Sequence, residues 1–182
     1  THPQLLTRDH GGQEPVVIDN IKVDVIATGA VTDDDLDGID DGPRLFVAGH
    51  RWALDTATTV TVATTAAIDD AHTIRVVTPA GLVAAKSHAV GFARSQRRST
   101  KHGSDLLDVY RLVDVHGPDE TAADLHTAPG QITPVIASVI RATFLARPGK
   151  AAALMTPVNT PLIDADHVAG IMESFVRALD HP

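Results

Sequence analysis

The amino-acid sequence predicts an α+β protein, with strands in its first 78 residues and helices after them. Two observations lead to this expectation. Short segments rich in Val, Ile and Thr, separated by turn residues, occur up to residue 78, and such segments are typical of strands. From residue 78 onward, longer apolar segments begin after N-cap residues and end near Gly or Pro, which is typical of helices. Strands followed by helices favour an α+β architecture.

Local signals place the individual elements. A hairpin is expected where the apolar residues 16–18 and 21–26 flank Asp19-Asn20. Thr78-Pro79 supplies an N-cap and a first-turn proline for one helix, and Ser104 an N-cap for the next. The expected strands are residues 16–18, 21–26, 45–48, 58–64 and 73–77. The expected helices are residues 79–95, 104–117, 133–146 and a last helix that Asp164 or Asp166 caps and that ends at Leu179. The chain thus divides into a β-rich part, 1–78, and a helical part, 79–182.

The composition is that of a globular protein with an aliphatic core. Hydrophobic residues make up 43% of the 182 residues, but aromatic residues only 3%. The formal net charge of −8 argues against a protein that coats nucleic acid along its whole surface, and leaves a local basic patch open. The absence of cysteine excludes disulfides and thiolate metal sites. No apolar run approaches the roughly 20 residues that span a bilayer, so we expect a cytoplasmic protein with no membrane partner.

Residues 32–42 form an acidic segment between the second and third expected strands. Its spacing Asp33-x-Asp35-x-Asp37 matches the first half of an EF-hand calcium loop. Arg44 occupies position 12, however, where a calcium loop carries a bidentate Glu. The pattern therefore favours a solvated acidic loop over a calcium site.

Lys86 is the most informative residue of the sequence. In the expected helix its neighbours one turn away are all apolar, namely Leu82, Val83, Ala89 and Val90. One interpretation is a surface lysine at the edge of an amphipathic helix. The other is an ammonium that holds a phosphate or a buried carboxylate.

A basic cluster follows this helix. Residues 93–102 contain Arg94, Arg97, Arg98 and Lys101 and no acidic residue. The cluster is either a solvated turn between helices or a patch for nucleotide phosphates or an RNA backbone. In an acidic chain, its position between Lys86 and Asp108 favours the patch.

Asp105 and Asp108 lie one turn apart in the helix expected to begin at Ser104. The position of Asp105 can be explained by structure alone, because the N-terminus of a helix favours a carboxylate. Asp108 can pair with Arg111 at i+3 on the surface or point inward towards Lys86.

Asp24 lies between Val23 and Val25 in an expected strand. Alternation places its side chain on the face opposite to both valines. It is either on the solvent face of an edge strand or a carboxylate aimed across a sheet at a metal or hydroxyl.

Residues 76–89 and 97–112, with Lys86 in the first segment and Asp105-x-x-Asp108 in the second, resemble the AbiEii-type nucleotidyltransferase toxins. These proteins belong to the polymerase-β-like nucleotidyltransferase superfamily, and the MenT toxins are relatives. The resemblance extends over about residues 73–116 and is looser around Asp24. It implies a nucleotidyltransferase-like mixed β-sheet in residues 1–78, followed by a helical part, 79–182, with phosphate-binding helices.

The resemblance also implies a function: a toxin of a toxin–antitoxin pair that transfers a nucleotide from an NTP to an RNA acceptor such as the tRNA 3′ end. Lys86 matches the helix lysine that contacts phosphates, and Asp105 and Asp108 match the two acids of the helix motif. Asp24 resembles the third carboxylate and would bind Mg²⁺. With Lys86, the basic cluster would bind the triphosphate and the acceptor RNA.

The sequence departs from the family in one respect. The superfamily carries Gly-Ser and an Asp-x-Asp pair before the third carboxylate, and no such motif precedes Asp24 in this sequence. Two expectations therefore remain open: a Mg²⁺-dependent nucleotidyltransferase, and a non-catalytic, degenerate nucleotidyltransferase that binds nucleotide or a cognate antitoxin.

Overall fold

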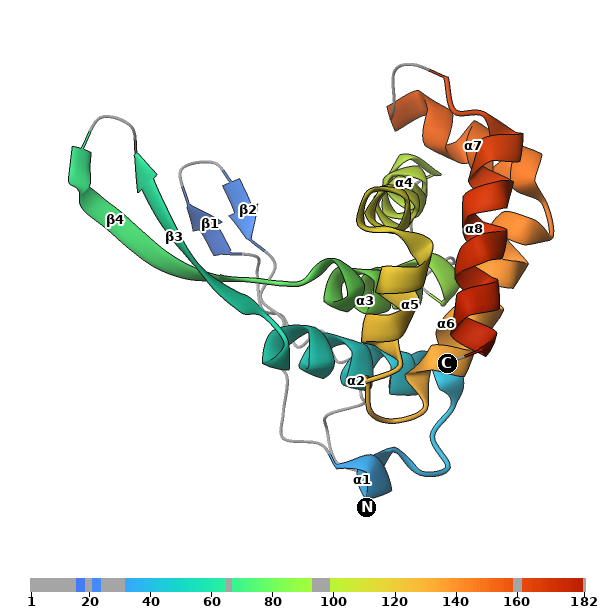
Figure 1. The fold of residues 1–182 in the computed structure, drawn as a ribbon, viewed down its shortest axis with the longest axis horizontal. Coiled ribbons are helices and arrows are strands. Elements are labelled where there is room, and N and C mark those ends of the chain that lie inside the picture. The colour runs from blue at the N-terminus through green and yellow to red at the C-terminus, as the bar shows by residue number, and fades with distance from the viewer. Residues whose placement is uncertain are drawn as a thin grey trace.

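The computed structural model describes residues 16–18, 21–23, 32–64, 67–92, 99–158 and 162–181. The described elements, in chain order, are β1 (Val16–Ile18), β2 (Ile21–Val23), α1 (Asp33–Leu36), α2 (Asp41–Asp55), β3 (Thr58–Thr64), β4 (Ala67–Val76), α3 (Pro79–Gly91), α4 (Ser99–His116), α5 (Pro118–Leu125), α6 (Ile132–Ile140), α7 (Pro148–Met155) and α8 (Ala165–Asp180). A π-helical turn (Arg141–Leu145) follows α6, and a 3₁₀ turn (Thr156–Val158) follows α7. The fold is mixed α/β and mostly helical, with the β3–β4 hairpin extending away from the helices (Figure 1).

The strands form two separate antiparallel pairs among the described residues, rather than the one mixed sheet that we expected. β1 pairs with β2, as the Asp19-Asn20 turn predicts. β3 pairs with β4 in a register that places Val60 opposite Ile74. The prediction for β3 is confirmed, whereas β4 begins at Ala67, six residues before the expected start at Thr73.

Residues 45–48 are helical, so the strand predicted there is wrong. They lie inside the 15-residue helix α2, whose buried residues include Leu45, Ala48, Gly49 and Trp52. This spacing of three or four residues is the helical period, which a four-residue apolar run cannot reveal by itself. The acidic segment is likewise not one loop, because α1 begins after Thr32 and α2 begins at Asp41.

Two predicted helix starts are confirmed by their caps. The Thr78 hydroxyl accepts a hydrogen bond of 3.1 Å from the Gly81 N–H at the start of α3. The Asp164 carboxylate accepts one of 2.9 Å from the Asp166 N–H at the start of α8. The prediction for α4 is wrong at its start, because the helix begins at Ser99 instead of Ser104. A further helix, α5, lies between the two helices expected over residues 104–117 and 133–146, where no helix was predicted.

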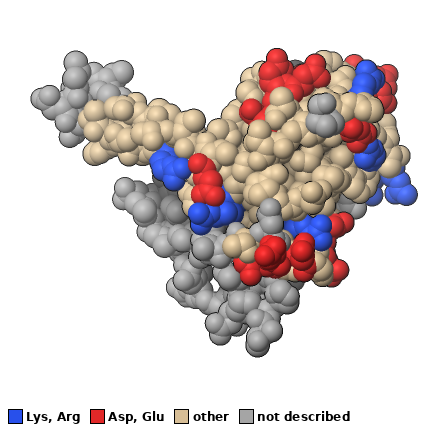
Figure 2. Space-filling view, turned by 60° about the horizontal axis from the view of Figure 1, so that its bottom comes forward, with Lys and Arg blue, Asp and Glu red and all other residues tan. Residues whose placement is uncertain are grey.

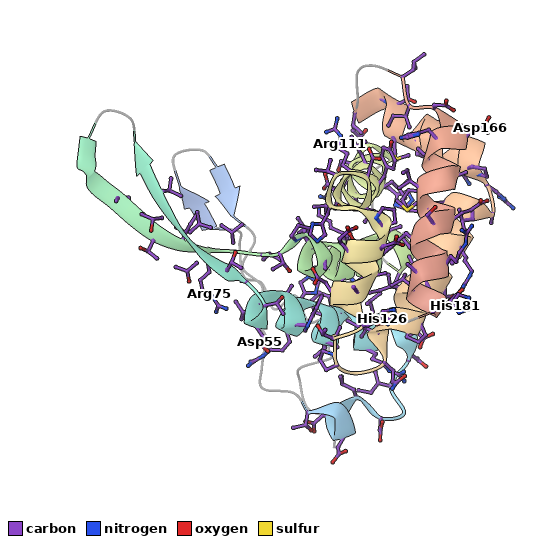
Figure 3. The ribbon with its side chains drawn as sticks, viewed as in Figure 1. Asp55, Arg75, Arg111, His126, Asp166 and His181 are labelled. Atoms are coloured by element: carbon purple, nitrogen blue, oxygen red, sulfur yellow. The ribbon has the colours of Figure 1, made fainter. Side chains whose placement is uncertain are left out.

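The core lies between the helices and is mainly aliphatic, as the composition predicts, with Phe144 and Phe175 as its largest fully buried side chains. Helix α3 packs on both α2 and α4, and its residues Val83, Ala84 and Val90 are fully buried. The Arg75 guanidinium of β4 lies near the end of α2 (Figure 3) and ties the hairpin to that helix by donating to the Leu54 carbonyl at 2.6 Å. None of the described helices is long and apolar enough to cross a membrane. The packing of α3 on α4 positions the candidate site.

Candidate functional site

Lys86 on α3 faces two carboxylates on α4. Its Nζ lies 2.8 Å from Asp108 Oδ2 and 3.0 Å from Asp105 Oδ1. The contact with Asp108 is the one that the sequence left as an alternative to a surface pair with Arg111. The two interactions come from residues one helical turn apart, so α4 presents both carboxylates on the face that packs on α3.

Asp105 is a buried anion between two cations. Its side chain is only 1% exposed, and its Oδ1 also accepts a 3.0 Å hydrogen bond from Lys101 Nζ. The macrodipole explanation from the sequence is wrong, because α4 begins at Ser99 and Asp105 lies beyond the first turn. A buried carboxylate needs partners, and Lys86 and Lys101 provide them. Lys101, expected in the phosphate patch, therefore pairs with Asp105.

Both ends of the Lys86–Asp105 pair stay charged near neutral pH. Burial alone lowers the pKa of Lys86, but hydrogen bonds to Asp108 and Asp105 and the charges of both outweigh it and raise that pKa above the ordinary value. Burial alone raises the pKa of Asp105, but hydrogen bonds from Lys101 and Lys86 and their charges outweigh it and lower that pKa. The site therefore holds a permanent ammonium, which suits binding an anion better than abstracting a proton.

Because the pKa of Asp105 is lowered in the folded protein, the stability of the protein depends on pH in the acidic range. In the unfolded chain the carboxyl regains its higher, ordinary pKa, so the unfolded state takes up protons first as the pH falls. The stabilisation is complete above about pH 5 and is lost as the pH falls through the lowered pKa. We expect the urea midpoint of the wild type to fall in this acidic range and that of Asp105→Asn to fall less. An equal acid dependence in both proteins would contradict the ion pairing.

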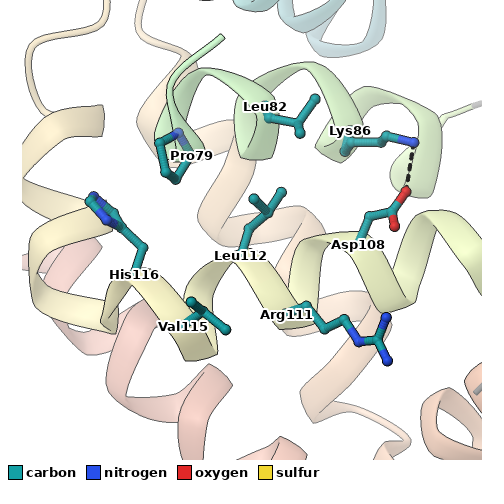
Figure 4. Close-up of a pocket in the computed structure, with 8 residues that line it drawn as sticks. All are labelled: Pro79, Leu82, Lys86, Asp108, Arg111, Leu112, Val115 and His116. Atoms are coloured by element: carbon teal, nitrogen blue, oxygen red, sulfur yellow. Dashed lines mark ion pairs between the residues drawn. The ribbon is translucent and has the colours of Figure 1, made fainter. Parts of the chain in front are cut away.

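Lys86 lies at one end of a groove between α3 and α4 (Figure 4). The groove has a volume of about 600 Å³. Its lining residues are Pro79, Leu82, Lys86, Asp108, Arg111, Leu112, Val115 and His116. The side chain of Lys86 is 24% exposed and that of Asp108 is 45% exposed, so both can meet a ligand.

Several groove residues were not assigned a role from the sequence. Leu112 and His116 follow Asp108 at intervals of four, and Leu82 precedes Lys86 by four. This spacing places each set on one helix face and is the signal that could have found them. Only the packing of α3 on α4 shows that the two faces enclose a groove.

Four predicted site residues lie outside the described residues: Asp24, Arg94, Arg97 and Arg98. On the face shown in Figure 2, the described Lys and Arg side chains form small groups with Asp and Glu beside them. The described part of the chain contains no group of three or more His, Cys, Asp or Glu residues that could hold a metal ion. Asp105 and Asp108 do not fit a Mg²⁺ site, because lysine ammoniums already neutralise them.

Comparison with known proteins gives no relative: no family model, no curated protein and no solved structure matches the chain. The fold and the site define a mixed α/β, mostly helical protein with a Lys–Asp–Asp cluster at the end of an open groove.

Proposed function

We propose that the chain is a nucleotidyltransferase-like toxin of the AbiEii type, which transfers a nucleotide from an NTP to an RNA acceptor such as the tRNA 3′ end. The observation that supports this proposal is the Lys86 ammonium, held by Asp105 and Asp108 at one end of the groove. Phosphoryl transfer depends mainly on positioning and on electrostatic stabilisation of the phosphates, and a fixed ammonium supplies both.

The geometry suggests a distinct role for each residue of the cluster. An ammonium has three protons, and Asp105 and Asp108 face two of them, which leaves one for a phosphate oxygen. Asp105 is buried and fixes the position of Lys86. Asp108 is exposed enough to share the ammonium with an incoming ligand. A cognate antitoxin as a partner belongs to the same proposal.

A non-catalytic nucleotide-binding protein is the second candidate. This candidate is favoured because Asp105 and Asp108 both pair with lysines and are therefore unavailable as metal ligands. In this case Lys86 binds the phosphates of an NTP without transfer, and the bound nucleotide or the surface around it contacts the antitoxin. The two candidates share the phosphate site and differ only in turnover.

Incubation with Mg²⁺, each labelled NTP and total tRNA tests the proposal. We expect label on RNA with the wild type and a loss of at least about 100-fold with Lys86→Ala, the size of effect seen when one transition-state donor is removed. Lys150→Ala, which removes an exposed lysine of α7, is the matched control and should label RNA normally.

The outcomes separate the candidates. NTP binding that disappears in Lys86→Ala, without any labelled RNA from the wild type, would select the non-catalytic protein. Labelling or NTP binding that is the same in Lys86→Ala and the wild type would contradict both.

A further inference from the structure

The groove between α3 and α4 has two chemically different ends. Lys86 and Arg111 lie at one end, together with Asp108 (Figure 4). Leu82 and Leu112 lie in the middle, and Val115 and His116 at the other end with Pro79. A ligand that fits this arrangement carries negative charge at one end and presents an apolar surface at the other.

Val115 marks the apolar end as a surface that a ligand would cover. Val115 is 86% exposed as a residue, although it lies one turn after the partly buried Leu112 on α4. Leu82 and Pro79 of α3 reach the same hollow from the other side. Apolar side chains from two helices around one hollow are typical of a small-molecule site, in which a few polar groups fix the orientation of the ligand.

His116 supplies a polar group at this end. Its Nε2 lies 3.4 Å from Asp124 Oδ2 on α5, which orients the ring. The other ring nitrogen can donate to or accept from the edge of a heterocycle, depending on the tautomer.

We infer that the groove binds the nucleoside triphosphate itself, with the phosphates at Lys86 and Arg111 and the base over Leu112 and Val115. The inference rests on the proposed function and adds the orientation of the nucleotide. The volume of about 600 Å³ lies within the range of small-ligand pockets. The cations lie at one end only, which fits a triphosphate, whereas an RNA strand distributes its phosphates along the chain.

Equilibrium dialysis with each NTP, inorganic tripolyphosphate and a short RNA oligonucleotide tests the inference. The variants are Val115→Glu, which places a carboxylate at the base end, and Lys86→Ala. Leu162→Glu is the matched control, because Leu162 is 82% exposed and does not line the groove. Both Glu variants change an exposed apolar residue and add the same charge, so they should fold alike.

Val115→Glu is expected to weaken NTP binding by at least about tenfold, because the base would meet a carboxylate instead of an apolar surface. Tripolyphosphate binding should change little, since it needs only the cationic end. Leu162→Glu should bind both ligands as the wild type does, and Lys86→Ala should lose both.

Each other outcome has a defined meaning. If Val115→Glu binds NTP as the wild type does while Lys86→Ala does not, the orientation is overturned and the phosphate site remains. If only binding of the RNA oligonucleotide responds to Val115→Glu, the groove takes an RNA end and the inference is overturned. If Lys86→Ala binds NTP and tripolyphosphate normally, the proposed function is overturned as well.

Discussion

Gly103→Ala is expected to destabilise the protein by about 3 kcal/mol, the upper part of the range for overpacking that displaces backbone. A Cβ at Gly103 would lie 2.1 Å from the Leu154 carbonyl oxygen and 3.0 Å from the carbonyl carbon. Both atoms belong to the backbone of α7, so no side-chain rotation can relieve the clash. Helix α4 would have to move away from α7, with the loss of the contacts between them. The free energy of unfolding from urea denaturation measures the effect.

Gly170→Ala is the matched control for this variant. Gly170 is exposed in α8, and a Cβ there meets nothing within 4 Å. Alanine is the better helix former, so this change is expected to stabilise the protein by about 0.5–1 kcal/mol. The same Gly→Ala substitution in two helices should therefore change the free energy of unfolding in opposite directions. Similar effects of the two changes would contradict the close approach of α4 and α7.

The clash at Gly103 also bears on the candidate site. Gly103 lies on α4 between Lys101 and Asp105, whose side chains are joined by a hydrogen bond. A displaced α4 would move Asp105 relative to Lys86 on α3. Gly103→Ala is therefore expected to disturb the charged cluster as well as the packing of α4 on α7.

Features that local chemistry determines could be predicted from the sequence. Thr78 and Asp164 cap α3 and α8 because a short polar side chain before an apolar segment satisfies the first free N–H groups of a helix. The pairing of β1 with β2 follows from Asp19-Asn20, which separate the two apolar segments in the sequence. These signals act within a few residues, so they do not depend on the rest of the fold.

Features that depend on packing could not be predicted. Residues 45–48 read as a strand because four apolar residues fit either structure, and only the burial of Leu45 and Trp52 against the other helices identifies a helix. The contact of Lys86 with Asp108 could be anticipated from helix faces. The burial of Asp105 could not, because it depends on the start of α4 at Ser99 and on how α4 packs on α3.

Asp105→Asn is expected to cost about 2–3 kcal/mol, somewhat less than a fully buried ion pair because Lys101 is half exposed. The substitution leaves two ammoniums, of Lys86 and Lys101, facing a neutral amide that cannot balance their charge. Asp108→Asn is the matched comparison, since it is the same change one turn further along α4 at a side chain that is 45% exposed. Its cost is expected to be below about 1 kcal/mol, because solvent screens an exposed pair.

The exposed carboxylate, which matters less for stability, should be the one whose removal does not weaken NTP binding. Asp108→Asn leaves Lys86 fixed by Asp105 and removes a competitor for its ammonium, so NTP binding should be at least as tight as in the wild type. Stability from urea denaturation and NTP binding from dialysis, measured on both variants, check this separation. Equal losses of stability would mean that the burial of Asp105 does not distinguish it from Asp108. Weaker NTP binding by Asp108→Asn would contradict the view that this carboxylate shares the ammonium with the ligand.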